Sequence, residues 1–252
     1  MTDESELLKK RFLELSRKSY DAGIFCFTDF LGLAEQSLFN EVRSKLFGTH
    51  YEVYGGAVGA ERVMIRFGSE EDCGYSLPFP IVCLKVSPKS PKFADKLTHR
   101  DFLGAILNLG IERSTVGDIV IRDNVGYVFV NEDIAEYVRG ELTRIKRTDV
   151  EVCEAHELPE GELYKTERKT VQINSERIDA VIAKVYNLSR DDAQSLFQKK
   201  LVFIDGVLTE SPSKTPKTDN VVSVRGYGRF IYLGGDSFSK KGKLNASVLV
   251  YV

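Results

Sequence analysis

The chain has 252 residues, of which 42% are hydrophobic and 29% charged, and its formal net charge is −2. This composition excludes a low-complexity chain, and the length suffices for two or three small domains. Its longest apolar runs are far shorter than the roughly 20 residues that cross a membrane. The N-terminus opens on acidic residues rather than on a signal peptide. We therefore expect a cytoplasmic protein without a membrane partner.

The cysteines and histidines do not follow the patterns of disulfide or metal sites. Cys26, Cys73, Cys83 and Cys153 stand far apart and form no C-x-x-C pair, so we expect reduced thiols. The three histidines have no cysteine or carboxylate at a metal-ligand spacing. We expect neither a metal nor another cofactor.

Charge is distributed unevenly along the chain. Residues 168–252 carry 14 Lys and Arg against 8 Asp and Glu, a net charge of +6, whereas residues 1–167 carry 21 against 29, a net charge of −8. A basic C-terminal third on an acidic body indicates one end that faces a polyanion.

The first part of the chain predicts two helices followed by a short sheet. Apolar residues recur at helical spacing from Leu7 to Leu15, and a second helical stretch lies within residues 30–47. Residues 51–58 and 61–67 resemble two strands around a glycine-containing turn. The spacing of Gly55-Gly56-x-x-Gly59 is not that of a phosphate-binding loop, and no helix follows it, so we interpret these glycines as a turn.

The middle part predicts the order β-α-β-β-α-β, with the two central strands joined through Asp123-Asn124. Ferredoxin-like and RNA-recognition (RRM) folds share this split arrangement, which hosts many functions. The predicted strands are residues 81–86, 116–122, 125–131 and 149–153, and the predicted helices are residues 99–109 and 134–145.

The last part predicts two short helices followed by strands. Ser175 is the predicted N-cap of the first helix, and the second opens with a capping box at Ser189-x-x-Asp192. Within residues 202–208, Asp205-Gly206 is the pair that type I′ hairpin turns prefer. Further strands are predicted at residues 221–225, 229–233 and 246–252.

Two stretches are predicted to be linkers, residues 68–80 and 156–170, because they combine Gly or Pro with charge and lack periodicity. They divide an α+β chain into three small domains. These are an N-terminal helical and β domain (residues 1–72), a ferredoxin-like, RRM-like middle domain (77–158) and a C-terminal domain (170–252).

The two C-terminal helices, joined by Asn187-Leu188, are expected to present cations at a rigid corner. Such clusters contact the phosphates of folded RNA, where arginine offers a planar fork and lysine a point charge. Tyr227 and Phe230 are candidates to stack on a base, with core packing left open for Phe230. A solvated basic face is the alternative interpretation. The predicted RNA-binding residues are Arg177, Lys184, Arg190, Lys199, Lys200, Lys214, Lys217, Arg225 and Arg229.

The sequence SERIDAVIAKVYNLSRDDAQSLFQKKLVFIDGVL (175–208) resembles the S4 RNA-binding motif over its whole length. The resemblance implies an S4 (αL-type) RNA-binding domain in which Arg177, Arg190 and Lys199 contact RNA. It also implies that Asp179 organises the helix corner. The chain departs from the family at Lys200-Leu201, where the family often has glycine before the strand.

Three further blocks are similar to the YlmH family, in which an RRM-like domain precedes an S4 domain. They are YGGAVGAER (54–62), LTHRDFLGAILNLGIERSTVGDIVI (97–121), and VRGYGRF (224–230) before SKKGK (239–243). The resemblance implies binding to rRNA of the large ribosomal subunit and to tRNA, in quality control of stalled, nascent-chain-blocked subunits. It also makes Arg100 and Arg113 secondary RNA contacts. Lys240 and Lys241, near the S4-like module, are predicted as further ones, and a monomer is expected.

Two other functions stay open. An RNA-modifying enzyme, of pseudouridine synthase or methyltransferase type, would use the S4-like module for targeting. Arg177-Ile178-Asp179 is similar to the R-L-D of pseudouridine synthases, and His99-Arg100-Asp101 suggests acid–base chemistry. Both triplets suit structural roles in helices better, so we predict no catalytic residue. A protein–protein adaptor, linked to cell division, would fit the acidic N-terminal part.

Overall fold

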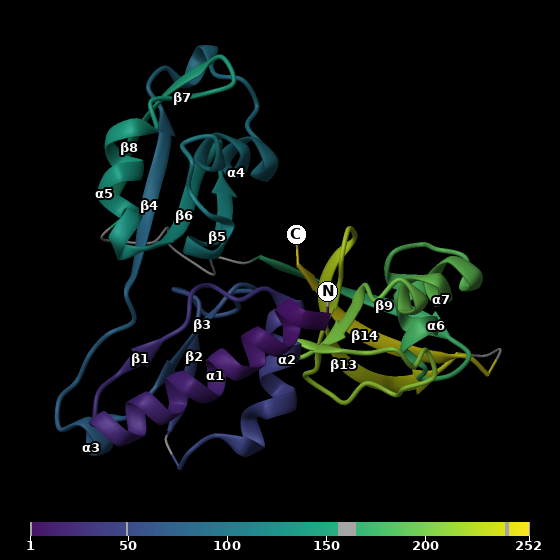
Figure 1. Cartoon of the computed structure of the whole chain (residues 1–252). Coiled ribbons are helices and arrows are strands. Elements are labelled where there is room, and N and C mark those ends of the chain that lie inside the picture. The colour runs from purple at the N-terminus through teal and green to yellow at the C-terminus, as the bar shows by residue number, and fades with distance from the viewer. Residues whose placement is uncertain (1, 49, 156–164, 240–241, 252) are drawn as a thin grey trace. The chain divides into compact units, whose positions relative to one another are not determined.

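A computed structural model describes residues 2–48, 50–155, 165–239 and 242–251 (Figure 1). The chain divides into two compact units, Met1–Leu163 and Tyr164–Val252. The described residues have a mixed α/β architecture with three antiparallel sheets. None of the described helices is long and apolar enough to cross a membrane.

The N-terminal part of the first unit packs helices on a three-stranded sheet of order β1-β3-β2. Phe12, on the longest helix, is fully buried against a core that includes Phe39 and Phe67. Leu7 is 67% exposed, so the predicted apolar stripe is wrong at its first position. The elements are α1 (Thr2–Ala22), β1 (Cys26–Phe27), α2 (Leu33–Val42), η1 (Arg43–Lys45), β2 (Tyr51–Tyr54), β3 (Met64–Phe67) and α3 (Glu70–Cys73).

The middle part has the predicted β-α-β-β-α-β order, with strands arranged as β5-β6-β4-β8-β7. Asp123 and Asn124, with φ of 49° and 67°, form the two-residue turn between β5 and β6, as type I′ geometry requires. The predicted helix 134–145 is wrong at its end, because Arg144–Ile145 pairs with β8 as a strand. The elements are β4 (Ile81–Pro88), η2 (Pro91–Phe93), α4 (His99–Leu107), η3 (Arg113–Thr115), β5 (Val116–Arg122), β6 (Val125–Asn131), α5 (Glu132–Glu141), β7 (Arg144–Ile145) and β8 (Thr148–Glu154).

The two faces of this middle sheet are covered differently. Alternate residues of β6, Val128 and Val130, join the core that contains Phe102 of α4. Phe129 therefore points to the opposite face, yet it is only 1% exposed. There it lies against Gly56, where an added Cβ would come within 2.3 Å of the Phe129 ring. A loop of the N-terminal part thus covers the face of the sheet that the helices leave open.

The second unit packs two helices on a six-stranded sheet of order β11-β10-β12-β13-β14-β9. The predicted linker 156–170 is wrong at its end, because Thr166 starts the edge strand β9, while residues 156–164 lie outside the described part. The predicted cap Ser175 is also wrong, since Arg177 is the N-cap of α6. The elements are β9 (Thr166–Ile173), α6 (Ile178–Val185), α7 (Arg190–Gln198), β10 (Val202–Ile204), β11 (Val207–Leu208), β12 (Val221–Val224), β13 (Gly228–Phe238) and β14 (Leu244–Tyr251).

Candidate nucleic-acid interface

Helices α6 and α7 and the turn between them form a compact corner, which we call the helix corner. Asn187, with φ of 54°, takes the left-handed conformation that reverses the chain, and the Leu188 N–H donates to the Ala183 carbonyl at 2.8 Å. Ser189 then caps α7 as predicted, because its Oγ accepts the N–H of Asp192 at 3.1 Å. The apolar sides of both helices join the core of the second unit.

Asp179 holds the helix corner together from inside. Its side chain is fully buried and accepts two hydrogen bonds from the Arg177 guanidinium, at 3.0 Å to Nε and 2.9 Å to the terminal nitrogen. Gln194 Nε2 of α7 donates to the same carboxylate at 3.1 Å, and Arg190 Nε lies 3.9 Å away. This arrangement agrees with the expectation that Asp179 organises the corner.

The surroundings of Asp179 keep its carboxyl group ionised. Burial alone would raise the pKa of Asp179, but the hydrogen bonds from Arg177 and Gln194 outweigh burial, and the pKa lies below its ordinary value. The same contact raises the pKa of Arg177. One buried charge therefore holds Arg177 by two hydrogen bonds and lies 3.9 Å from Nε of Arg190, so the two arginines come close together at the surface.

The predicted RNA-binding residues of the second unit all reach the surface where the structure describes them. Arg177 and Arg229 are half-buried. Lys240 and Lys241 lie outside the described residues. The exposed residues are Lys184, Arg190, Lys199, Lys200, Lys214, Lys217 and Arg225.

Several of these cations also have contacts within the unit. Lys200 Nζ lies 3.3 Å from Glu210, and both side chains are mostly exposed. The guanidinium of Arg225 lies 5.2 Å from the centre of the Phe203 ring, and that of Arg229 lies 4.1 Å from the centre of the Tyr251 ring. Stacking of this kind restrains an arginine while its polar edge stays available to a ligand.

The two aromatic candidates for base stacking, Tyr227 and Phe230, differ in their exposure to solvent. Phe230 is fully buried in the core, which excludes it from contact with RNA. Tyr227 is 47% exposed, and its ring centre lies 5.7 Å from that of Tyr186. Tyr227 therefore remains the candidate that can meet an unpaired base.

Helix α7 ends in a Schellman motif, the closure in which a left-handed residue terminates a helix. The Lys200 N–H donates to the Phe197 carbonyl and the Leu201 N–H to the Leu196 carbonyl, both at 3.0 Å. Lys200 has φ of 56°, a conformation that favours glycine. At this departure from the S4 motif the chain therefore places a lysine in a conformation that glycine would adopt without strain.

Comparison with known proteins shows what the chain is similar to. Residues 78–158 match the family model described as "Putative RNA-binding domain in YlmH". The resemblance to the YlmH family is confirmed. The chain is 28% identical over 222 residues to "Ribosome-associated protein quality control protein P2" of Bacillus subtilis (strain 168), covering 86% of this chain and 83% of that relative. A solved structure, "Cell division protein ylmH from Streptococcus pneumoniae", is similar with a TM-score of 0.47 and 24% identity, covering 60% of this chain and 90% of that one.

The two YlmH-like blocks of the first unit meet in space. The carboxylate of Asp118 accepts the backbone N–H groups of Glu61 and Arg62, at 2.7 and 3.0 Å. The Arg62 guanidinium in turn donates to the carbonyls of Phe30 at 2.8 Å and Val116 at 2.9 Å. We call this set of contacts the Arg62 joint. Sequence reasoning missed it, although both partners stand in blocks that the resemblance singled out.

Arg113 belongs to the Arg62 joint rather than to an open surface. It is half-buried, and its guanidinium donates to the carbonyls of Val116 and Gly117. Burial, with Arg62 nearby, lowers the pKa of Arg113 to about 10. This guanidinium therefore stabilises the joint, and contact of Arg113 with RNA stays a prediction.

Arg100 lies on a different part of the YlmH-type domain. It is exposed at the start of α4 and lines a shallow hollow of about 440 Å³ with Arg144 and Lys146. Asp101 beside it completes the capping box of α4, where its side chain accepts the N–H of the N-cap Thr98 at 2.8 Å and pairs with Lys146 Nζ at 2.6 Å. The Lys146 and Thr98 contacts lower the pKa of Asp101 to about 2, so Asp101 serves the capping box as an ionised carboxylate.

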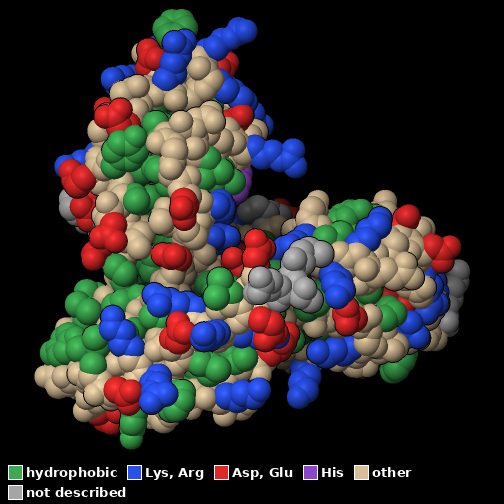
Figure 2. All heavy atoms as spheres, viewed as in Figure 1, with side chains coloured by type: hydrophobic (Ala, Val, Ile, Leu, Met, Phe, Trp, Pro, Cys, Tyr) green, Lys and Arg blue, Asp and Glu red, His purple; other side chains and the backbone are tan. Residues whose placement is uncertain are grey.

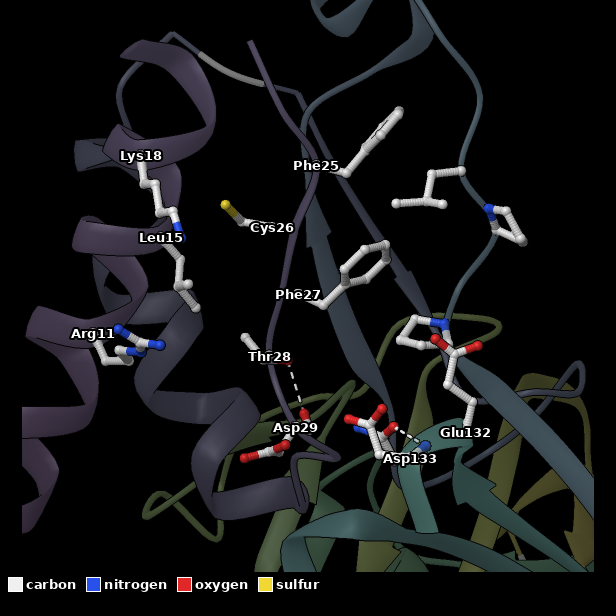
Figure 3. Close-up of a pocket in the computed structure, with 14 residues that line it drawn as sticks. Arg11, Leu15, Lys18, Phe25, Cys26, Phe27, Thr28, Asp29, Glu132 and Asp133 are labelled. Atoms are coloured by element: carbon white, nitrogen blue, oxygen red, sulfur yellow. Dashed lines mark hydrogen bonds between the residues drawn. The ribbon is translucent and has the colours of Figure 1, made fainter. Parts of the chain in front are cut away.

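A second hollow of about 450 Å³ lies in the first unit, beside β1 (Figure 3). Arg11 and Lys18 of α1 line one side of it, and Asp29 and Asp133 come together at one end. The pKa of Asp29 is raised, mainly by burial and to a smaller extent by the nearby negative charge of Glu112. These lining residues mix both signs of charge. Burial raises the pKa of the Cys26 thiol, and the Thr28 hydroxyl donates to the Asp29 carbonyl at 2.8 Å, so neither is an activated nucleophile. We therefore do not treat this hollow as a catalytic site.

The cysteines are free thiols, as predicted. Burial raises the pKa of Cys83, on β4, to about 12, so its thiol is a poor nucleophile. Across the part of the chain that the structure describes, no three metal-ligating side chains converge.

Proposed function

We propose that this chain is a non-catalytic RNA-binding protein that grips structured RNA with the helix corner of its C-terminal unit. The observation that carries the proposal is the buried Asp179 carboxylate, which holds Arg177 by two hydrogen bonds and lies 3.9 Å from Nε of Arg190. Fixed arginines lose less conformational entropy when they bind phosphate than mobile side chains do. Lys199 and Lys200, at the opposite end of α7 from Arg190, add further exposed positive charge.

We further infer that the target is the large ribosomal subunit, with its 23S rRNA and tRNA as contacts, in the quality control of stalled translation. The printed name of the Bacillus relative supports this inference, since it describes a ribosome-associated quality control protein. Such a role takes place in the cytoplasm, and a monomer suffices for it. A protein–protein adaptor linked to cell division stays the alternative function.

The domain division belongs to the same proposal. We infer an RRM-like domain over residues 77–158 and an S4 domain over residues 170–252, with a helical and β domain at residues 1–72. The strand order β5-β6-β4-β8 around two helices supports the first assignment. Two short helices followed by the type I′ hairpin at Asp205 and Gly206, with φ of 50° and 71°, support the second.

The geometry around Asp179 favours RNA binding over RNA modification. In the pseudouridine synthase reading, Asp179 would be a nucleophile and would need access to a base. Instead its side chain is fully buried and bound to Arg177 and Gln194. Mass spectrometry of cellular RNA separates the two functions, because an enzyme would leave a modification that disappears on gene deletion.

Co-sedimentation with purified Bacillus subtilis large ribosomal subunits tests the proposed function. The double variant Arg190→Glu, Lys199→Glu should no longer pellet with the subunits. A matched variant, Lys10→Glu with Arg17→Glu on exposed positions of α1, should pellet like the unaltered chain. If the corner variant binds as well as the matched variant, the helix corner is not the RNA-binding surface.

Salt dependence gives an independent measure. Each phosphate contact contributes roughly 0.7–0.9 to the slope of log affinity against log salt concentration. Loss of Arg190 and Lys199 should therefore reduce that slope by about 1.5. An unchanged slope would mean that neither side chain contacts a phosphate.

A further inference from the structure

The middle part carries a second cationic surface, at the end of its sheet opposite the Arg62 joint. Residues 85–100 contain five Lys and Arg and a single acid, Asp95. Residues 1–167 as a whole have a net charge of −8, so this run stands out locally. Figure 2 shows Lys and Arg side chains gathered at this end, where Figure 1 labels β7.

A loop at this end, residues 89–97, presents an aromatic side chain to solvent. We call it the lysine loop. Phe93, at the end of η2, is 91% exposed. Lys89, Lys92 and Lys96 are exposed on the same loop, and Lys146 and Arg147 are exposed in the turn between β7 and β8. An isolated exposed phenylalanine is unremarkable, but one surrounded by cations has the composition of a nucleic-acid contact.

The lysine loop is held in place at both ends. The Lys89 N–H donates to the Asp149 carbonyl at 2.9 Å. Asp95 donates its N–H to Thr148 Oγ1 at 2.9 Å, and its side chain accepts the N–H of Arg147 at 3.3 Å. Asn124 Nδ2, in the β5–β6 turn, donates to the Asp95 carbonyl at 2.9 Å.

These anchors matter because they fix the base of the loop before any ligand arrives. Between them, Pro91 at the start of η2 restricts the backbone further. A preorganised aromatic side chain loses little entropy on binding. Phe93 is thus presented to solvent, 91% exposed, on a loop that is anchored at both ends.

The sheet face of this domain cannot supply the stacking that RRM domains use. Those domains stack bases on aromatic residues of their central strands. Here the central strand β6 carries Tyr127 and Phe129, which are only 8% and 1% exposed. Gly56 lies against Phe129 on that face. Any base stacking by the middle part must therefore use another aromatic side chain.

We propose that the lysine loop is a second RNA contact, in which Phe93 stacks on an unpaired base while Lys92 and Lys96 bind the flanking phosphates. The inference rests on the proposed function and adds a site to it. Positive charge on an otherwise acidic unit selects a polyanion, and the exposed phenyl ring selects an unpaired base over a uniform duplex.

Binding of full-length variants to purified Bacillus subtilis large ribosomal subunits tests the proposal. Base–aromatic stacking is worth roughly 1–3 kcal/mol, so Phe93→Ala should raise Kd about fivefold or more. Phe93→Trp should bind like the unaltered chain, and Phe93→Leu should bind like Phe93→Ala. Val58→Ala is the matched control, because Val58 is 95% exposed on another loop of the first unit, and Kd should not change. Lys92→Ala with Lys96→Ala should lower the salt slope by about 1.5.

Photocrosslinking identifies what lies against the loop. With p-benzoylphenylalanine at position 93, crosslinks to rRNA or tRNA support the proposal, and crosslinks to ribosomal protein alone overturn it. Full binding by Phe93→Leu also overturns it, since an apolar protein contact would tolerate leucine. If Phe93→Ala binds normally while the double variant Arg190→Glu, Lys199→Glu does not bind, the proposal for the lysine loop is overturned and the proposed function stands. If the unaltered chain does not bind subunits, the proposed function fails and the second contact fails with it.

Discussion

The carboxylate of Asp118 accepts the backbone N–H of Arg62 at 3.0 Å, across 56 positions of sequence. This hydrogen bond joins the glycine-rich loop that follows β2 to strand β5. The Arg62 side chain then reaches the carbonyls of Phe30 and Val116, which lie in the N-terminal and middle parts. One arginine therefore ties together three segments that are distant in sequence.

Substitution of Arg62 tests this joint. Arg62→Lys keeps the charge but loses the planar guanidinium that reaches several carbonyls. We therefore expect the free energy of unfolding to fall by about 2–3 kcal/mol. Arg113→Gln should cost less, because it removes a cation whose pKa the nearby Arg62 already lowers. Urea unfolding of both variants measures the difference. A larger cost for Arg113→Gln would show that the joint depends on Arg113 instead.

Acid should weaken the helix corner through Asp179. Its folded-state pKa is lowered, so its stabilising contribution is complete above the unfolded pKa of about 3.9 and is lost as pH falls through the folded value. The free energy of unfolding should therefore fall more steeply below about pH 4 in the unaltered chain than in Asp179→Asn. Denaturation at several pH values provides the comparison, and parallel curves would contradict the account.

Lys200 offers a stabilising substitution. Its φ of 56° is strained for any residue with a Cβ, so Lys200→Gly should raise the free energy of unfolding by about 0.5–1 kcal/mol. The exposed pair with Glu210 contributes little against this. Lys199→Gly is the matched control, because Lys199 has φ of −78° and glycine there should destabilise. Thermal melts of both variants decide the matter, and equal effects would refute the backbone argument.

Gly56 should be intolerant of even the smallest side chain. It has φ of 92°, and a Cβ would lie 2.3 Å from the Phe129 ring, so we expect Gly56→Ala to destabilise by about 1–3 kcal/mol. Gly140 provides the contrast, since its Cβ would meet nothing within 4 Å in helix α5. Gly140→Ala should leave stability unchanged or raise it slightly. Comparable losses in the two variants, measured by chemical denaturation, would remove the steric explanation.

Local rules predicted most of the elements because their signals are local. Asp123-Asn124 and Asp205-Gly206 specify type I′ turns, and Ser189 specifies a helix start, whatever the rest of the chain does. The prediction of Ser175 as the N-cap is wrong because the start of α6 depends on where this helix packs, and Arg177 is the N-cap instead. The burial of Phe230 also depends on packing, so the sequence alone does not show whether this ring stacks on an RNA base or packs in the core.

The candidate site was predictable in its residue types and less so in its architecture. The S4-like motif pointed to Arg177, Arg190 and Asp179, and the structure brings these three side chains together. The part that Arg113 plays in the joint could not be predicted, because its carbonyl accepts a hydrogen bond from Arg62, which lies 51 positions away. Contacts between distant segments leave no periodic signal in one sequence, so neither the Arg62 joint nor the cover over Phe129 was foreseen.

The cover over Phe129 has a practical consequence for anyone who cuts the protein into pieces. Residues 78–158 look like a domain that could fold alone. A fragment limited to them would lack Gly56, however, and would expose the Phe129 ring beside the Cys83 thiol. In such a fragment an apolar face of the sheet and a thiol that can be oxidised would be exposed to solvent. Self-association or weak nucleotide affinity measured on it would then reflect the cut rather than the protein.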